Sequence, residues 1–173
     1  MLIAGQYNLY MKQEADLLVE QINVNANDNE NYLRKHYSIT FLGKGWGRHV
    51  EALRKVGYEV SHITFAENYQ EELVKHDIQI TPIAIGTGTK GKVLDALANG
   101  LMVIGTPYAL ENIAVENGVS CVEYRQPQEV IEVLRDIPNN ISKYEAMAEA
   151  GRRQVLEHHN REKISRELFG LFS

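Results

Sequence analysis

Glycines and lysines gather where an apolar strand gives way to a helical pattern. Gly86, Gly88 and Gly91 follow a strand expected over residues 78–81, and they lead directly into a helix expected over residues 92–98. A glycine loop that ends at a helix N-terminus presents free backbone N–H groups and the positive end of the helix dipole. The segment is therefore a candidate site for an anion, usually a phosphate. The alternative is that the glycines only allow helix and strand to pack closely.

Two known phosphate-binding patterns are partly met by this loop. Its GxGxxG spacing matches the dinucleotide fingerprint, which requires an acidic residue about 20 residues on, at the end of the next strand. That strand ends in Gly-Thr-Pro at 105–107, so the acid is missing. Residues 86–92 also spell GxxxxGK, but Val93 stands where a P-loop needs Ser or Thr to hold Mg²⁺. An NAD-dependent enzyme and a P-loop NTPase are thus the weaker alternatives.

The residues around the loop predict where its flanking elements begin and end. Pro82 should end the preceding strand because it has no N–H to donate. Thr89 is the expected N-cap of the helix, and Gly100 stands where a left-handed residue commonly follows a helix. Residues 101–104 contain no polar side chain, as expected for a parallel strand that is covered on both faces.

The remaining chain repeats the alternation of strand and helix. Apolar runs predict further strands at 2–4, 38–42, 60–65 and 120–124, and helical spacing predicts helices at 14–22, 49–56, 69–76, 128–137 and 142–172. The asparagine-rich segment 23–31 is expected to be a mobile loop. This order predicts an α/β fold, a single Rossmann-like, doubly wound parallel sheet of about six strands with helices on both faces. Residues 1–173 are expected to form one domain.

Composition limits the possible partners. The 173-residue chain is 44% hydrophobic and 24% charged, and its net charge of −5 argues against nucleic-acid binding. A single cysteine, Cys121, leaves no disulfide or thiolate metal cluster, and the histidines lack metal-ligand spacing. No apolar run has the length of a membrane span, and the first residues do not read as a signal peptide. A cytoplasmic protein without a metal is expected.

The segment TPIAIGTGTKGKVLDALANGLMVIGTPYALENI resembles the donor-binding, C-terminal domain of GT-B fold glycosyltransferases of the group 1 type. In that family a proline after the fourth strand precedes a glycine loop, a Lys-Val-Leu-Glu-Ala helix, an Ala-x-Gly stop and another strand. The order and length of the elements agree over nearly the whole chain. The matching residues are Pro82, Gly86, Gly88, Lys92, Val93, Leu94, Ala96, Ala98, Gly100, Val103 and Ile104.

The resemblance implies metal-independent, retaining transfer of a hexose from a nucleoside diphosphate sugar to a saccharide or lipid-linked acceptor, with no other cofactor. UDP and GDP are the implied nucleotides, and polysaccharide biosynthesis is the implied setting. Asp95 takes the position of the family's ribose-binding acid, although an ion pair with Lys92 is the alternative. The substrate-binding residues expected on these grounds are Gly86, Thr87, Gly88, Thr89, Lys90, Lys92, Asp95, Lys44, Arg48, Lys12 and Glu111.

The chain departs from the family at positions that matter for chemistry. Many retaining members carry a sugar-binding glutamate eight residues before the helix acid, where this chain has Thr87, and Gln6 replaces a common arginine. The catalytic residues are therefore unassigned. Trp46 is expected to lie over a base or sugar, or to pack on another domain. A non-catalytic nucleotide- or partner-binding module that has lost its sugar-transfer residues is the alternative function.

The resemblance also implies a partner. GT-B enzymes bind the acceptor on a second domain of similar size, and a chain of 173 residues has room for only one such domain. An acceptor domain supplied in cis or in trans is therefore expected, and it could bring the protein to the inner face of a membrane. The chain alone is expected to bind the donor and to turn over little or nothing.

Overall fold

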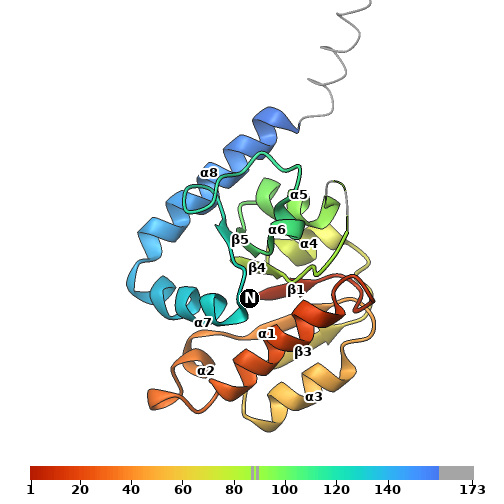
Figure 1. Ribbon diagram of the computed structural model, residues 1–173, viewed down its shortest axis with the longest axis vertical. Coiled ribbons are helices and arrows are strands. Elements are labelled where there is room, and N and C mark those ends of the chain that lie inside the picture. The colour runs from red at the N-terminus through yellow and green to blue at the C-terminus, as the bar shows by residue number, and fades with distance from the viewer. Residues whose placement is uncertain (87, 89, 160–173) are drawn as a thin grey trace, which may run out of the picture.

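The strands predicted from the sequence form one parallel sheet in the computed structural model (Figure 1), which describes residues 1–86, 88 and 90–159. The strand order is β3-β2-β1-β4-β5-β6, so the order reverses between β1 and β4. The predicted α/β fold and the doubly wound sheet are confirmed. The strands are β1 (Leu2–Ala4), β2 (Ile39–Leu42), β3 (Val60–Ile63), β4 (Ile78–Thr81), β5 (Met102–Gly105) and β6 (Val122–Glu123).

Helices cover both faces of this sheet, as predicted (Figure 1). The helices α1, α2, α3 and α7 pack on one face, whereas α4, α5 and the end of α8 pack on the other. Two of them, α2 and α6, were not predicted. The helices are α1 (Lys12–Val24), α2 (Tyr32–His36), α3 (Gly47–Lys55), α4 (Tyr69–Leu73), α5 (Gly91–Ala98), α6 (Pro107–Leu110), α7 (Pro127–Asp136) and α8 (Ile141–His158), with 3₁₀ turns η1 (Asn29–Asn31) and η2 (Ile137–Asn139).

The strand β5 is buried on both sides, as its continuous apolar run predicts. Along β5, Met102 and Ile104 belong to the core under α1 and α7, whereas Val103 belongs to the core under α5. Successive side chains of a strand point to opposite faces, so an uninterrupted apolar run fits only a strand covered twice. The expectation for residues 101–104 is confirmed.

The last described helix, α8, crosses from one core to the other. Its beginning places Tyr144 and Met147 in the first core, and Val155 lies in the second. Gly151 permits this crossing, because a Cβ there would lie 2.5 Å from the backbone oxygen of Ser120. The helix ends at His158, and the rest of the predicted 142–172 helix lies outside the described residues.

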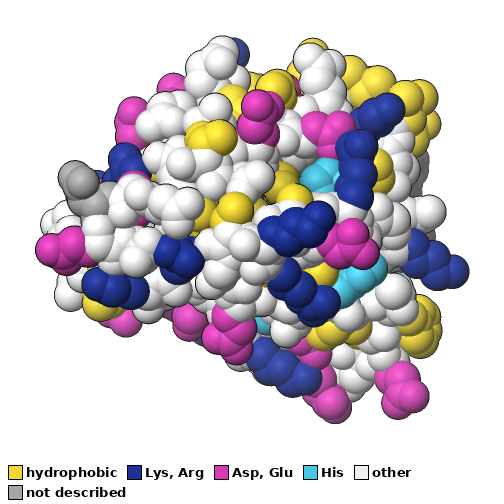
Figure 2. All heavy atoms as spheres, turned by 90° about the horizontal axis from the view of Figure 1, so that it is seen from below, with side chains coloured by type: hydrophobic (Ala, Val, Ile, Leu, Met, Phe, Trp, Pro, Cys, Tyr) yellow, Lys and Arg dark blue, Asp and Glu magenta, His cyan; other side chains and the backbone are white. Residues whose placement is uncertain are grey.

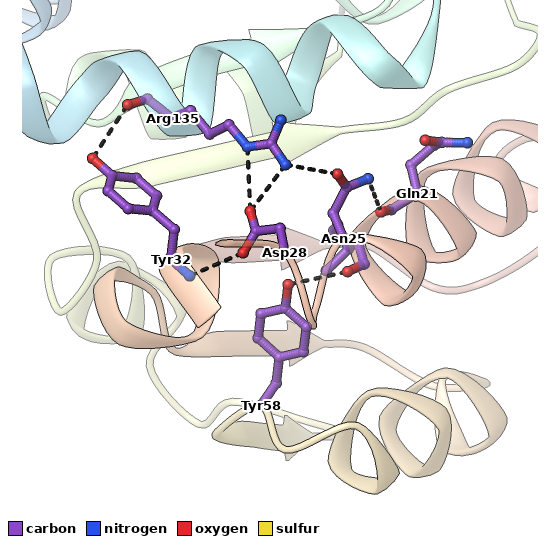
Figure 3. Close-up of polar contacts among 7 residues, drawn as sticks. Gln21, Asn25, Asp28, Tyr32, Tyr58 and Arg135 are labelled. Carbon is purple, nitrogen blue, oxygen red and sulfur yellow. Dashed lines mark hydrogen bonds and ion pairs between the residues drawn. The ribbon is translucent and has the colours of Figure 1, made fainter. Parts of the chain in front are cut away.

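Polar contacts hold the asparagine-rich connector against α7 (Figure 3). Arg135 donates through Nη2 to Asp28 Oδ2 at 2.9 Å and to Asn25 Oδ1 at 2.8 Å. The other oxygen of Asp28 accepts from the backbone N–H of Tyr32 at 3.0 Å, at the start of α2. The loop expected to be mobile therefore makes specific contacts that join α1, α2 and α7.

Candidate functional site

The candidate site lies where the strand order of the sheet reverses. All strands are parallel, so the loops after β1 and β4 leave the same edge on either side of the reversal. Tyr10, in the first loop, accepts a backbone hydrogen bond from Ala84, in the second, at 2.8 Å. Open α/β sheets bind ligands at this position, outside the carboxyl ends of the strands.

The glycine loop needs its glycines for backbone conformation. Gly86 and Gly88 have φ values of +140° and +81°, which side chains rarely adopt. Gly88 is exposed, and the Nζ of Lys90 donates to its carbonyl oxygen at 2.6 Å. The helix α5 begins at Gly91 with Lys90 as its N-cap residue, so the expected cap at Thr89 is displaced by one position. Thr87 and Thr89 themselves lie outside the described residues.

The position of this loop argues against the dinucleotide alternative. A dinucleotide fingerprint occupies the turn after the first strand of the sheet. The glycine loop here follows β4, and the turn after β1 carries Gly5 alone before Gln6.

The two expected site residues of α5 face α4. Lys92 places its Nζ 4.3 Å from the ring centroid of Tyr69, the first residue of α4. Asp95, one turn further along α5, is half-buried and forms no ion pair with Lys92 within the described residues. Burial, together with the charge of Asp95, raises the pKa of Tyr69 to about 12. The alternative that Asp95 serves only as an ion-pair partner of Lys92 is therefore not what the structure shows.

A buried amide fixes the first turn of α5. Gln79, in β4, is fully buried, and its Nε2 donates to the backbone oxygen of Lys92 at 3.2 Å and to Thr81 Oγ1 at 3.1 Å. Its position beneath the start of α5 links the strand before the glycine loop to the helix after it. The loop is thus anchored at both ends.

The three other expected cations lie at the same edge of the sheet. Lys12 begins α1 and is exposed, and Lys44 is exposed in the loop after β2. Arg48, in the first turn of α3, donates to Asp16 Oδ1 at 2.6 Å and to the hydroxyl of Tyr7. Asp16 therefore neutralises Arg48, whereas Lys12 and Lys44 form no ion pair within the described part of the chain.

A buried histidine completes the group around Asp16. His49 Nε2 lies 2.7 Å from Asp16 Oδ1, and its side chain is only 6% exposed. Burial lowers the pKa of His49 and outweighs the hydrogen bond to Asp16, which raises it. Partial burial raises the pKa of Asp16, but hydrogen bonds from His49, Arg48 and Tyr7 outweigh it and hold that pKa below its ordinary value.

The expectation for Trp46 was wrong. Its side chain is fully buried, and its Nε1 donates to the backbone oxygen of Gly5 at 2.8 Å. Its ring lies 4.8 Å from that of Phe41 in the core. Trp46 thus joins the loops after β1 and β2 from inside the molecule, and it is not available to stack on a base or a sugar.

Glu111 lies at the end of α6, after the strand next to β4. It is exposed and is the C-cap residue of that helix, and Asn112 follows with a φ of +59°. Thr106 begins the helix, since its side chain accepts from Ala109 N at 3.2 Å and donates to Ile83 O at 2.6 Å. Glu111 is thus carried by an element that is tied to the segment before the glycine loop.

A separate cleft lies away from this edge. A cleft of ≈ 660 Å³ lies at the opposite, amino-terminal edge, where Met1, Ser38, Ile78 and Met102 stand at or just before the first residues of their strands. It contains none of the expected site residues. Topology and the glycine loop are the better guides to the site here, because the cleft lies at the amino ends of the strands, whereas open α/β sheets bind ligands outside the carboxyl ends.

Charge and hydropathy add three observations. On the face shown in Figure 2, basic and acidic side chains are interspersed rather than separated into one basic surface. Among residues 1–86, 88 and 90–159, no group of three or more His, Cys, Asp or Glu side chains is placed to hold a metal ion. In the same residues no helix is long and apolar enough to cross a membrane.

Sequence reasoning missed Tyr69 and Asp16. Each lies within a helix, and each meets its partner through a contact between elements that are far apart in sequence, 33 residues in the case of Asp16 and His49. The only available signal for Tyr69 was its place directly after Asn68, whose side chain caps α4 by accepting from Glu71 N.

A sheet of this order, with a glycine loop and a helix N-terminus at the reversal, defines a Rossmann-like α/β domain. This chain belongs to the family described as glycosyl transferase-like, whose model matches residues 18–170. No curated protein matches the sequence.

Solved structures confirm the fold. HepE of Anabaena, in complex with UDP, superposes with a TM-score of 0.77 at 12% identity, over 99% of this chain and 48% of that chain. For TarM, which has also been solved from S. aureus with UDP, the TM-score is 0.76 at 12% identity, over 99% of this chain and 35% of the other. The C-terminal domain of the Francisella tularensis group 1 glycosyl transferase LpcC gives a TM-score of 0.69 at 13% identity, over 92% of this chain and 86% of that chain.

These lengths bear on what the chain contains. It spans about half the length of HepE and a smaller share of TarM, but most of the isolated C-terminal domain of LpcC. The resemblance to a C-terminal domain of group 1, GT-B glycosyltransferases is thereby confirmed.

Proposed function

We propose that this chain is the nucleotide-sugar-binding half of a glycosyltransferase that transfers a hexose from a nucleoside diphosphate sugar to a saccharide or lipid-linked acceptor. One observation carries the proposal. The glycine loop opens α5 at the reversal of the strand order, and Asp95 stands one turn into that helix. The loop would bind the diphosphate, and Asp95 would bind the neighbouring ribose.

The diphosphate would bind at the beginning of α5. This helix has no acidic residue in its first turn, so the positive end of its dipole is not opposed by a carboxylate. The backbone N–H groups of Gly88 and Lys90 belong to the loop that precedes it. Fixed amides of this kind stabilise the negative charge that develops on a leaving nucleoside diphosphate, without a metal ion.

Asp95 would bind the ribose. A carboxylate has two acceptor oxygens, which suit the adjacent hydroxyls of a ribose. Its distance along the helix from Gly91 is about one turn, or about 6 Å. Lys12 and Lys44, which are exposed at the same edge, would supply further positive charge.

A uridine nucleotide is the first candidate for the donor. HepE has been solved with UDP and with UDP-glucose, and TarM has been solved with UDP. These ligands belong to those proteins, and they support UDP as the first probe for this chain.

The acceptor would be bound by a second domain in cis or in trans. The match to about half of HepE supports this part of the proposal. Metal independence and retention of anomeric configuration are part of the same proposal. The chain alone would bind the donor without appreciable transfer.

A second function has one observation in its favour. Arg48, an expected phosphate ligand, is neutralised by Asp16. A non-catalytic module that keeps the fold and binds a nucleotide or a protein partner could retain such a contact at no cost.

Calorimetric titration with UDP, GDP, ADP, UDP-glucose, GDP-mannose and NAD, without added metal, tests the proposal. Binding of one nucleoside diphosphate and of its sugar is the expected result. Binding of NAD alone would overturn the proposal, and binding of none of the six ligands would favour the non-catalytic module.

A further inference from the structure

Tyr69 lies beneath the side chain of Lys92. It is the first residue of α4, and the Lys92 Nζ stands 4.3 Å from the centroid of its ring. An ammonium group within about 6 Å of an aromatic centroid is attracted to the negative face of the ring. The contact joins α4, which follows the edge strand β3, to the helix that begins at the glycine loop.

Neighbouring hydrogen bonds hold α4 and the start of α5 in place. Asn99 Nδ2 donates to Gln70 Oε1 at 2.6 Å, which ties the start of α4 to the end of α5. Gln79 Nε2 donates to the backbone oxygen of Lys92 at 3.2 Å. The exposed side chain of Lys92 is therefore the movable part, and the ring of Tyr69 determines where its ammonium lies.

The ring, rather than the hydroxyl, of Tyr69 makes this contact. The hydroxyl oxygen is buried and has no hydrogen-bond partner among the described residues. Loss of a buried hydroxyl that has no partner removes no hydrogen bond. Phenylalanine should therefore replace Tyr69 without loss of the contact, whereas leucine should abolish it.

We propose that Tyr69 is a positioning residue of the nucleotide-sugar site, which holds the Lys92 ammonium beside the N-terminus of α5 for the diphosphate. The inference rests on the proposed function. A free lysine side chain samples many rotamers, and ordering it on binding has an entropic cost. The ring reduces that cost before the ligand arrives. An exposed contact of this kind corresponds to about a two- to fivefold change in affinity.

The contact itself can be measured without any ligand. Protons above an aromatic ring shift upfield, so the ε-methylene protons of Lys92 should show this shift in the NMR spectrum of the wild-type protein. The shift should remain in Tyr69→Phe and disappear in Tyr69→Leu. Its absence from the wild type, or its persistence in Tyr69→Leu, would overturn the inference whatever the protein binds.

Calorimetric titration with UDP then tests the consequence. Tyr69→Leu should weaken UDP binding about two- to fivefold relative to the wild type, and Tyr69→Phe should keep the wild-type affinity. In a Lys92→Met background, Tyr69→Leu should have no further effect. An equal loss in that background would show that Tyr69 acts only on the fold and would overturn the positioning role.

Lys143→Met is the matched control. Its Nζ lies 4.8 Å from the ring centroid of Tyr144, a residue of the cleft at the opposite edge. The substitution removes a lysine charge from a comparable ring contact, together with an ion pair to Asp136 Oδ2 at 3.1 Å, and it should leave UDP affinity unchanged. An upfield shift without binding of UDP or any other nucleotide would contradict the proposed function itself, and with it the positioning role.

Discussion

The backbone of Gly43 lies directly against that of Gly5. A Cβ on Gly43 would stand 2.2 Å from the carbonyl oxygen of Gly5, and Gly43 has a φ of +140°. The same oxygen accepts the indole N–H of Trp46 at 2.8 Å. The loops after β1 and β2 thus meet so closely that no side chain fits between them, and this contact builds one side of the candidate site.

Gly43→Ala should therefore destabilise the protein strongly. The substitution adds both a strained backbone conformation and a clash with another backbone, and we expect a loss of at least ~3 kcal/mol in the free energy of unfolding. Urea denaturation followed by circular dichroism measures it. Gly47→Ala, at the first residue of α3 directly after the same loop, is the control, because a Cβ there meets nothing within 4 Å. Equal stability of the two variants would contradict this account.

The ion pair between Asp28 and Arg135 should stabilise the connector between α1 and α2. Asp28 is only 13% exposed, so Arg135→Met would leave a largely buried carboxylate without its strongest partner. We expect a loss of about 1–2 kcal/mol in the free energy of unfolding. Arg125→Met, which breaks a pair whose arginine is 73% exposed, should cost less than about 0.5 kcal/mol. A larger loss in Arg125→Met than in Arg135→Met would contradict the role of this pair.

The stability of the protein should fall as the pH is lowered from about 7 to about 5. Burial lowers the pKa of His49 from its ordinary value of 6.5, so below 6.5 the unfolded chain binds a proton that the folded chain resists. This contribution is fully present above 6.5 and is lost as the pH falls through the folded pKa. The pKa of Asp16 is held below its ordinary value, so Asp16 does not titrate in this pH range. The pKa of His76 is lowered as well, so His76 also makes the protein less stable as the pH falls.

Comparison with His49→Gln isolates the contribution of His49. Urea denaturation at several pH values should give a smaller change in the free energy of unfolding for the variant than for the wild type. Asp16, Arg48 and Tyr7, which surround His49, are unchanged in that comparison. The same pH dependence in both proteins, or a wild type that gains stability on acidification, would show that His49 is not a buried neutral residue.

Local sequence was a good guide to the sheet and to the loop at its edge. Pro82 and Gly100 mark the ends of β4 and α5 as predicted, because each acts through its own backbone. The predicted strand at 60–65 ends at Ile63, and the one at 120–124 is only Val122–Glu123, because an edge strand is paired on one side only.

Contacts between distant elements could not be predicted in the same way. Trp46 looked like an exposed aromatic residue, and its burial depends on the carbonyl oxygen of Gly5, 41 residues away. The partner of Lys92 depends on where α4 lies relative to α5, which periodicity does not determine. A short helix such as α6 leaves little periodic signal, and it is recognised only through the cap made by Thr106.

Asp95 provides the most direct test of the proposed donor site. Calorimetric titration with UDP, without added metal, would compare the wild type with Asp95→Ala and with Glu149→Ala, a control carboxylate that is 64% exposed beside the cleft at the opposite edge. We expect binding in the wild type and in the control, and at least about a tenfold loss in Asp95→Ala, since two hydrogen bonds to a charged group would be removed. Equal UDP affinity in Asp95→Ala and the wild type would contradict the account.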